Sequence, residues 1–263
     1  MQLNKIYNID CLEGMKQIPE KSIDLILTDL PYGVTDCEWD NIIPFAPLWE
    51  QYNRIAKERA AIVLFAVQPF TTKLINSNLK HFRYCWYWKK SNKTGFTYAK
   101  YQPMRCIEDI CVFYKHAPTY NPQGIKKIEN ARVRKHKDTG KDIVYKLRTQ
   151  KKEYKQEYTN YPVHLLHFKN EAANNKNRLH PTQKPLALCE YLVKTYTNAG
   201  DVVLDSCAGS GTTLLAAKNT GRQYIGFETD EKHFNTAVAR LSRQNATYCD
   251  ENKKIVDKTQ ATL

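Results

Sequence analysis

The chain of 263 residues lacks the features that mark a membrane protein or a secreted one. Its longest apolar run, AAIVLFAV at 60–67, is far too short to span a bilayer, and the opening MQLNKIYNID has no basic and apolar signal pattern. The eight cysteines are scattered, without a C-x-x-C pair or adjoining histidines, which disfavours both disulfides and a zinc site. We therefore expect a cytoplasmic protein with reduced thiols, no membrane span and no metal.

Acidic side chains are also in deficit. The chain has 27 Asp and Glu against 40 Lys and Arg, so its net charge is +13. Such an excess predicts a polyanionic partner, either nucleic acid or an anionic membrane surface. A solvated basic surface without a partner is the alternative.

Strand-like and helix-like stretches alternate along most of the chain, which predicts an α/β fold with a largely parallel sheet. The expected strands lie at 4–10, 22–29, 60–67, 84–90 and 108–115, and the expected helices at 11–19, 45–57, 70–80 and 186–196. From 245 onward the chain is polar, and we expect a loose tail.

Residues 117–178 differ in composition from both flanks. Between 121 and 155 there are twelve Lys and Arg against four Asp and Glu, so this stretch carries +8 of the net +13. Tyrosines at 145, 154, 158 and 161 interleave with the basic residues, as expected where side chains contact phosphates and bases. A disordered basic linker would also fit this composition.

Residues 200–230, GDVVLDSCAGSGTTLLAAKNTGRQYIGFETD, predict a strand, a glycine-rich turn, a helix and a second strand. Gly209 and Gly211 let backbone N–H groups approach a ligand, and Glu228 stands where an acid accepts from ribose hydroxyls. The third glycine of the dinucleotide fingerprint and the Gly-Lys-Ser/Thr of a phosphate loop are both missing. With Asp205 before the turn, the site suits a cationic amino group on an adenosine-bearing cofactor, although a merely tight turn would also explain the glycines.

TDLPYG at 28–33 follows the expected strand at 22–29. The exocyclic amine of a nucleobase is a poor nucleophile, because its lone pair is delocalised into the ring. A carboxylate from Asp29 and the carbonyl of Leu30, held by Pro31, can accept its two N–H groups and free that lone pair, while Tyr32 offers a face for an extruded base. A proline turn with a capping aspartate is the alternative.

Three motifs in order, D-L-P-Y at 29–32, HPTQKP at 180–185 and LDSCAGSGTT at 204–213, resemble the DNA amino-methyltransferases that use S-adenosylmethionine. The catalytic motif precedes the cofactor motif, which is similar to the permuted beta group of that family. The resemblance implies a Rossmann-like, seven-stranded mixed sheet with helices on both faces. It implies a catalytic half at 1–116, a target-recognition insert at 117–178, and a cofactor-binding half with a polar tail at 179–263.

The resemblance also implies roles for individual residues. The catalytic motif matches Asp29, Leu30, Pro31 and Tyr32, with Leu30 in place of the family's first proline. The cofactor site would be lined by Asp10, Cys11, Asp29, Thr182, Lys184, Asp205, Ala208, Gly209, Gly211, Thr212 and Glu228. Thr182 and Lys184 would close near the carboxylate of the cofactor. DNA contacts are expected from Lys89, Lys90, Lys126, Lys127, Arg132 and Arg134.

We therefore expect transfer of a methyl group from S-adenosylmethionine to N6 of adenine in duplex DNA, with the base flipped out. The leading aspartate of the motif favours adenine in this family. N4 of cytosine stays open, as do methylation of RNA or of a protein amide and a noncatalytic DNA-binding module. The resemblance leaves room for a homodimer and for a companion restriction nuclease.

Overall fold

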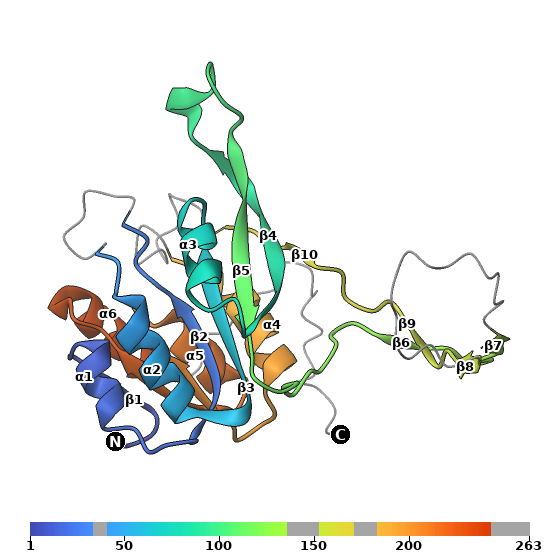
Figure 1. Ribbon diagram of the computed structural model, residues 1–263, viewed down its shortest axis with the longest axis horizontal. Helices are drawn as coiled ribbons and strands as arrows, with labels where there is room; N and C mark the ends of the chain where they lie inside the picture. The colour runs from blue at the N-terminus through green and yellow to red at the C-terminus, as the bar shows by residue number, and fades with distance from the viewer. Residues whose placement is uncertain (34–40, 136–152, 171–182, 243–263) are drawn as a thin grey trace, which may run out of the picture.

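The computed structural model describes residues 1–33, 41–135, 153–170 and 183–242, and its centre is a single twisted sheet (Figure 1). Its strands in spatial order are β1 (Lys5–Tyr7), β12 (Gln223–Phe227), β11 (Val202–Asp205), β2 (Ile23–Asp29), β3 (Ala56–Ala66), β5 (Arg105–Phe113), β4 (Phe82–Thr94) and β10 (Leu165–His167). All neighbouring strands are parallel except β5, which is antiparallel to both β3 and β4. The expected mixed α/β sheet is confirmed.

The sheet has eight strands, whereas seven were expected. The additional strand is β10, whose three residues pair in parallel with Tyr87–Lys89 of β4. This strand comes from the stretch 117–178 that the sequence assigned to the insert. Its short, weakly patterned sequence, LLH, carries no periodic signal, so only the pairing with β4 identifies it as a strand.

Helices cover both faces of the sheet, as expected (Figure 1). They are α1 (Cys11–Lys16), α2 (Phe45–Ile55), α3 (Phe70–Ser77), α4 (Leu186–Tyr196), α5 (Thr212–Asn219) and α6 (Glu231–Ser242). One core cluster joins side chains of α1, α2 and α3 to the sheet, and a second joins those of α4 and α5 to its other face. Alternating residues of β2 supply both clusters: Leu25 and Leu27 face one, and Ile26 faces the other.

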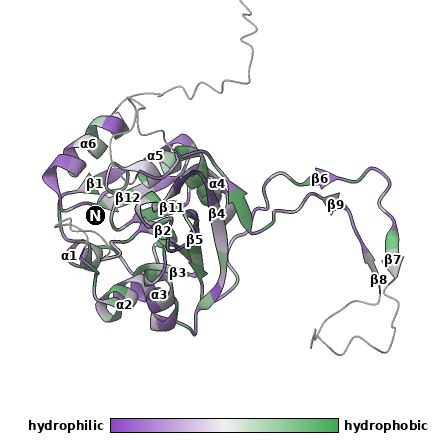
Figure 2. Ribbon diagram, turned by 90° about the horizontal axis from the view of Figure 1, so that it is seen from above, coloured by the Kyte–Doolittle hydropathy of each residue, from purple (hydrophilic) through white to green (hydrophobic). Residues whose placement is uncertain are grey.

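Two segments project from this body. The hairpin of β4 and β5 extends beyond the sheet, with the short helix η1 (Phe96–Tyr98) at its tip (Figure 1). An arm stands off to one side and carries two small antiparallel pairs, as Figure 2 shows from above. The arm pairs β6 (Lys126–Lys127) with β9 (Tyr158–Thr159), and β7 (Val133–Lys135) with β8 (Glu153–Lys155). Within the described ranges, no helix is long and apolar enough to cross a bilayer.

The order of the strands creates a switch point between β11 and β2. From β11 the chain passes through α5 to β12 on one side, and from β2 it passes through α2 to β3 on the other. Ligands of open α/β sheets bind in the crevice at the carboxyl ends of such diverging strands. Both sequence motifs therefore fall where the topology places a binding site.

Candidate active site

Asp29 and Asp205 are the last residues of the two strands at the switch point. The pairing of Val203 with Leu25 and of Leu204 with Ile26 brings the ends of β11 and β2 to the same edge of the sheet. A cavity of about 860 Å³ lies at this edge and is lined by residues of both motifs, from Asp29 and Tyr32 to Gly209 and Glu228. The two motifs thus form one continuous site.

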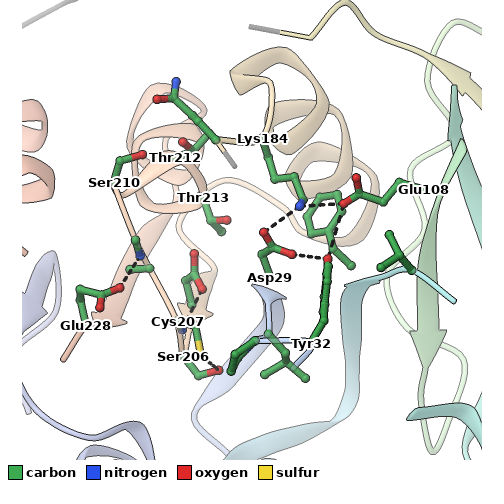
Figure 3. Close-up of a pocket in the computed structure, with 18 of the residues that line it drawn as sticks. Asp29, Tyr32, Glu108, Lys184, Ser206, Cys207, Ser210, Thr212, Thr213 and Glu228 are labelled. Carbon is green, nitrogen blue, oxygen red and sulfur yellow. Dashed lines mark hydrogen bonds and ion pairs between the residues drawn. The ribbon is translucent and has the colours of Figure 1, made fainter. Parts of the chain in front are cut away.

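Asp29 belongs to a cluster of charged groups at one end of the cavity (Figure 3). Its Oδ2 accepts from Nζ of Lys184 at 2.7 Å, and its Oδ1 accepts a short hydrogen bond from the hydroxyl of Tyr32. Lys184 also lies 2.7 Å from Oε1 of Glu108, whose Oε2 is 2.9 Å from Nζ of Lys90. Carboxylates and ammonium groups therefore alternate in the order Asp29, Lys184, Glu108 and Lys90.

This arrangement shifts the pKa values of Asp29, Glu108 and Lys184. Burial raises the pKa of Asp29, and the ammonium of Lys184 offsets only part of that effect. Burial by itself would raise the pKa of Glu108, but Lys184 and Lys90 lower it below its usual value. For Lys184, the attraction of Asp29 and Glu108 outweighs burial and raises the pKa, so its side chain is an ammonium at neutral pH.

The remaining residues of the catalytic motif lie around Asp29. The ring of Tyr32 is tilted by 36° against that of Phe70, with centroids 5.1 Å apart, and its hydroxyl is 3.5 Å from Oε1 of Glu108. The sequence predicted a stacking role for this ring and did not predict the contacts of its hydroxyl. Leu30 is 3% exposed and packs into the core on the α1–α3 side, which gives a physical reason for an apolar residue at this position.

The glycine turn forms the opposite end of the cavity. Gly209 and Gly211 have φ values of +51° and +75°, a conformation that residues with a Cβ rarely adopt. Asp205 is 3% exposed and accepts from the backbone N–H of Cys207 at 3.2 Å. Burial raises its pKa to about 7. An acid in this state suits a ligand that brings a positive charge, such as the amino group of the expected cofactor.

Neighbouring elements hold the turn in place. On α6, the guanidinium of Arg240 donates to Oγ1 of Thr212 at 2.8 Å and to the carbonyl of Ser210 at 3.2 Å. On the strand side, the N–H of Ser206 donates to Oγ1 of Thr28 at 3.0 Å, which ties the end of β11 to β2. Ala208, which lines the cavity, donates its N–H to the carbonyl of Phe227.

Three further expected cofactor residues line the same cavity. Glu228 follows β12, and its carboxylate accepts from the N–H of Gly209 at 2.7 Å and from that of Asp230 at 2.9 Å. Asp10 caps α1 by accepting from the N–H of Leu12 at 2.8 Å. Cys11 is buried beside it. The chain's own residues can therefore hold a nucleoside between the ends of β1 and β12 and an amino acid moiety beside Asp205.

The other predicted residues lie in different surroundings. Lys184 lines the cavity but contacts Asp29 and Glu108, at the end away from the glycine turn, and Thr182 lies outside the described residues. Lys89 is exposed on β4, whereas Lys90 points into the cavity toward Glu108. Among the basic residues predicted to contact DNA from the arm, Lys126, Lys127 and Arg132 have exposed side chains, and the structure describes only the backbone pairing of Arg134.

Glu108 is the functional candidate that the sequence did not reveal. It begins the predicted strand at 108–115, where an acid at a strand start reads as an ordinary solvated residue. The pairing of β4 with β5 sets Glu108 beside Trp88, and the segment before α4 brings Lys184 next to it. These tertiary contacts bury Glu108 among charged partners. A buried acid with two lysine partners is a signal that tertiary structure alone supplies.

Comparison with known proteins supports the reading of these motifs. The family model for N6/N4 DNA methylases matches residues 23–239. The type II methyltransferase M.HpaI of Haemophilus parainfluenzae is 28% identical over 251 residues, covering 89% of this chain and 73% of that protein. M1.MboII of Moraxella bovis is 26% identical over 263 residues, covering 90% and 96%.

Two solved structures share the fold. M1.HpyAVI in complex with SAM has a TM-score of 0.59 at 24% identity, with coverage of 90% of this chain and 98% of the other. The cytosine-N4-specific PvuII DNA methyltransferase has a TM-score of 0.67 at 19% identity, with coverage of 92% and 87%.

Proposed function

Because the chain belongs to the N6/N4 family of DNA methylases and uses S-adenosylmethionine as its cofactor, we propose that it methylates N6 of adenine at a specific site in duplex DNA. The family comprises adenine and cytosine enzymes, and the choice of adenine rests on the aspartate that leads the motif, Asp29. A homodimer and a companion nuclease stay predictions.

The observation that carries the proposal is the single cavity in which Asp29 and Asp205 end adjacent strands. A DNA-binding module without catalysis has no need for a carboxylate and a tyrosine hydroxyl at the bottom of such a cavity. Nor would it need a second buried acid whose pKa burial raises to about 7. A reaction between a cationic cofactor at one end of the cavity and an amine at the other would use both acids, Asp205 and Asp29.

The reaction requires positioning more than covalent catalysis. When bound, S-adenosylmethionine would supply a methyl group activated by its sulfonium, whose S–C bond breaks as the N–C bond forms, so that a neutral thioether leaves. The carboxylate of Asp29 accepts an N–H of the target amine, draws the nitrogen toward tetrahedral geometry, and takes the proton that the nitrogen loses after its lone pair has formed the new N–C bond. The ring of Tyr32 supports the flipped base, whose extrusion costs a few kcal/mol. Lys184 and Glu108 fix the charge state around Asp29.

We propose that the duplex is held by the arm and by the β4–β5 hairpin. The arm presents Lys126, Lys127 and Arg132 to solvent. Between 88 and 107 the chain has five basic residues and no acidic one, and exposed aromatic rings at 96, 98 and 101 occupy the hairpin tip. Thr94, Arg105 and Ile107 on the strands of this hairpin line the cavity, so DNA entering the site would lie against it. Cations for phosphates and rings for bases are the combination that nucleic acids require.

The test is to incubate the protein with unmethylated genomic DNA and S-adenosylmethionine, and to identify modified nucleosides by mass spectrometry. We expect N6-methyladenine, and none with the Asp29→Ala variant. N4-methylcytosine without N6-methyladenine would overturn the adenine assignment and keep the methylase. Parallel incubations with RNA and with protein separate the remaining substrate classes, and labelling of either in place of DNA would contradict the proposal.

A further inference from the structure

Lys184 occupies a position that its predicted role does not explain. The sequence placed it near the carboxylate of the cofactor, yet Nζ lies 2.7 Å from Asp29 and 2.7 Å from Glu108. Its side chain is 9% exposed, and that of Glu108 is 6% exposed. A buried ammonium is costly unless carboxylates surround it, so its two partners are what make this position favourable.

Removing that ammonium would leave the carboxylates of Asp29 and Glu108, each now 2.7 Å from Nζ, without the counter-ion that they share. Two carboxylates that share a site disfavour each other's ionisation, so one of the acids would take up a proton at a higher pH than before. Asp29 is the more susceptible, because burial and Glu108 both raise its pKa, whereas Glu108 keeps Lys90 as a second partner. A protonated Asp29 loses accepting capacity toward an amine N–H, and the proposed chemistry needs that capacity.

We infer that Lys184 and Glu108 are positioning residues for Asp29: Lys184 keeps the catalytic carboxylate charged and oriented, and Glu108, anchored by Lys90, keeps Lys184 in place. This inference rests on the proposed function, since it assigns these side chains to the amine-accepting step. Neither residue needs to contact the cofactor.

The geometry leaves room for the substrate. Tyr32 donates to one oxygen of Asp29 and Lys184 to the other, and each carboxylate oxygen can accept a second hydrogen bond. The target amine can therefore join as a third donor without displacing Lys184. The charged groups that face Asp29 are Lys184 before α4, Glu108 on β5 and, across the cavity floor, Asp205 on β11.

The test compares Lys184→Met, Glu108→Gln and the double variant with the wild type. Single-turnover methyl transfer is measured from pH 5 to 9, and cofactor affinity is measured by calorimetry. For Lys184→Met we expect the acid limb of the rate profile to move to higher pH, with a loss of at least about tenfold at pH 7 that is partly regained at pH 9. Glu108→Gln should move the limb to lower pH. The double variant, which removes one charge of each sign, should return it toward the wild-type position.

Cofactor affinity distinguishes this inference from the role that the sequence predicted. All three variants should bind S-adenosylmethionine within about threefold of wild type, because the ion pairs of Lys184 and Glu108 are with Asp29 and Lys90, and Asp205 and Glu228 have other partners. A Lys184→Met variant with much weaker cofactor binding and an unmoved pH profile would overturn the inference in favour of a cofactor-carboxylate contact. Unmoved profiles in all variants would overturn it too.

A matched control is available at the surface. Lys57 forms an ion pair with Asp24 at 2.7 Å outside the cavity, so Lys57→Met removes a comparable pair and should leave rate and pH profile unchanged. Titration of the Asp29 carboxyl by NMR in cofactor-free protein tests the inference without substrate. If wild type shows no methyl transfer, the proposed function fails, whereas an Asp29 titration that Lys184→Met does not shift upward sinks the positioning role by itself.

Discussion

The two ends of the cavity manage buried charge in opposite ways. Around Asp29, two carboxylates and two ammonium groups neutralise one another within the protein. Asp205 is less exposed than Asp29, yet within the described part of the chain no lysine or arginine forms an ion pair with it, and burial raises its pKa to about 7. The first end needs no ligand to balance its charge. The second lacks a counter-ion that a cationic ligand can provide. This difference agrees with the proposal of a reaction end at Asp29 and a binding end at Asp205.

The largest effect is expected from removing Asp29, the acid of the proposed reaction end. Asp29→Ala deletes the acceptor for the target amine but leaves Lys184 paired with Glu108 and the glycine turn untouched. We expect the rate of methyl transfer to fall at least about 100-fold, as for the loss of a general base. Cofactor affinity should stay within about threefold. Single-turnover rates and calorimetry measure the two effects.

Asp24 supplies the control for this change. It lies on the same strand as Asp29 but outside the cavity, where it pairs with Lys57. Asp24→Asn should therefore leave the rate near that of the wild type. An Asp29→Ala variant that turns over almost normally would show that the acid at this end is structural.

The binding end should respond in affinity and in its dependence on pH. Only ionised Asp205 attracts the amino group of the cofactor, so wild-type affinity should rise with pH up to about 7, by as much as roughly tenfold per unit below that value. Calorimetry between pH 5.5 and 7 tests this, because an α-amino group stays largely protonated there. Asp205→Asn should weaken binding about tenfold at pH 7 and flatten the pH dependence. A wild-type affinity that is flat over this range would contradict the assignment.

The stability of the cofactor-free protein provides an independent sign test. The pKa of Asp205 is raised in the folded state, so its favourable contribution to folding is present below its usual value of 3.8 and is lost as pH rises through about 7. At pH 8 the buried carboxylate therefore destabilises the fold. Asp205→Asn should raise the melting temperature at pH 8 and have little effect at pH 4.

Substitutions in the arm should have the smallest effect on methyl-transfer rate and on cofactor affinity. Replacing Lys126, Lys127, Arg132 and Arg134 with Ala removes positive charge far from both acids. DNA affinity should weaken, and the slope of log K against log salt should flatten by up to about 0.9 for each lost phosphate contact. The rate at saturating DNA and the cofactor affinity should be unchanged. Filter binding over a salt series checks this, and an unaltered slope would exclude the arm as a phosphate-binding surface.

The sequence predicted the two acids for a simple reason. Asp29 and Asp205 each end an apolar run that reads as a buried strand, and a strand end is a local property. The prediction that they share one cavity depended on the family resemblance, because no local sequence pattern shows that β11 lies beside β2. The ion-pair cluster around Asp29 could not be predicted from the sequence, because the partners of Glu108 come from β4 and from the segment before α4. Lys90 is a further example. Its sequence context predicts an exposed lysine that contacts DNA, but its side chain points into the cavity and pairs with Glu108.

The pairing of β1 with β12 has a consequence for how the protein folds. The side chain of Asn8, just after β1, donates to the carbonyl of Glu228, which lies 220 positions along the chain. During synthesis, β1 and the edge of β2 that pairs with β11 must therefore wait for their neighbours until residues 202–228 have left the ribosome. Contacts between such distant residues slow folding, because a large loop must close before they contribute. The cavity cannot assemble before β11 and β12 have been made, so a translation product that ends before residue 202 would lack the proposed site.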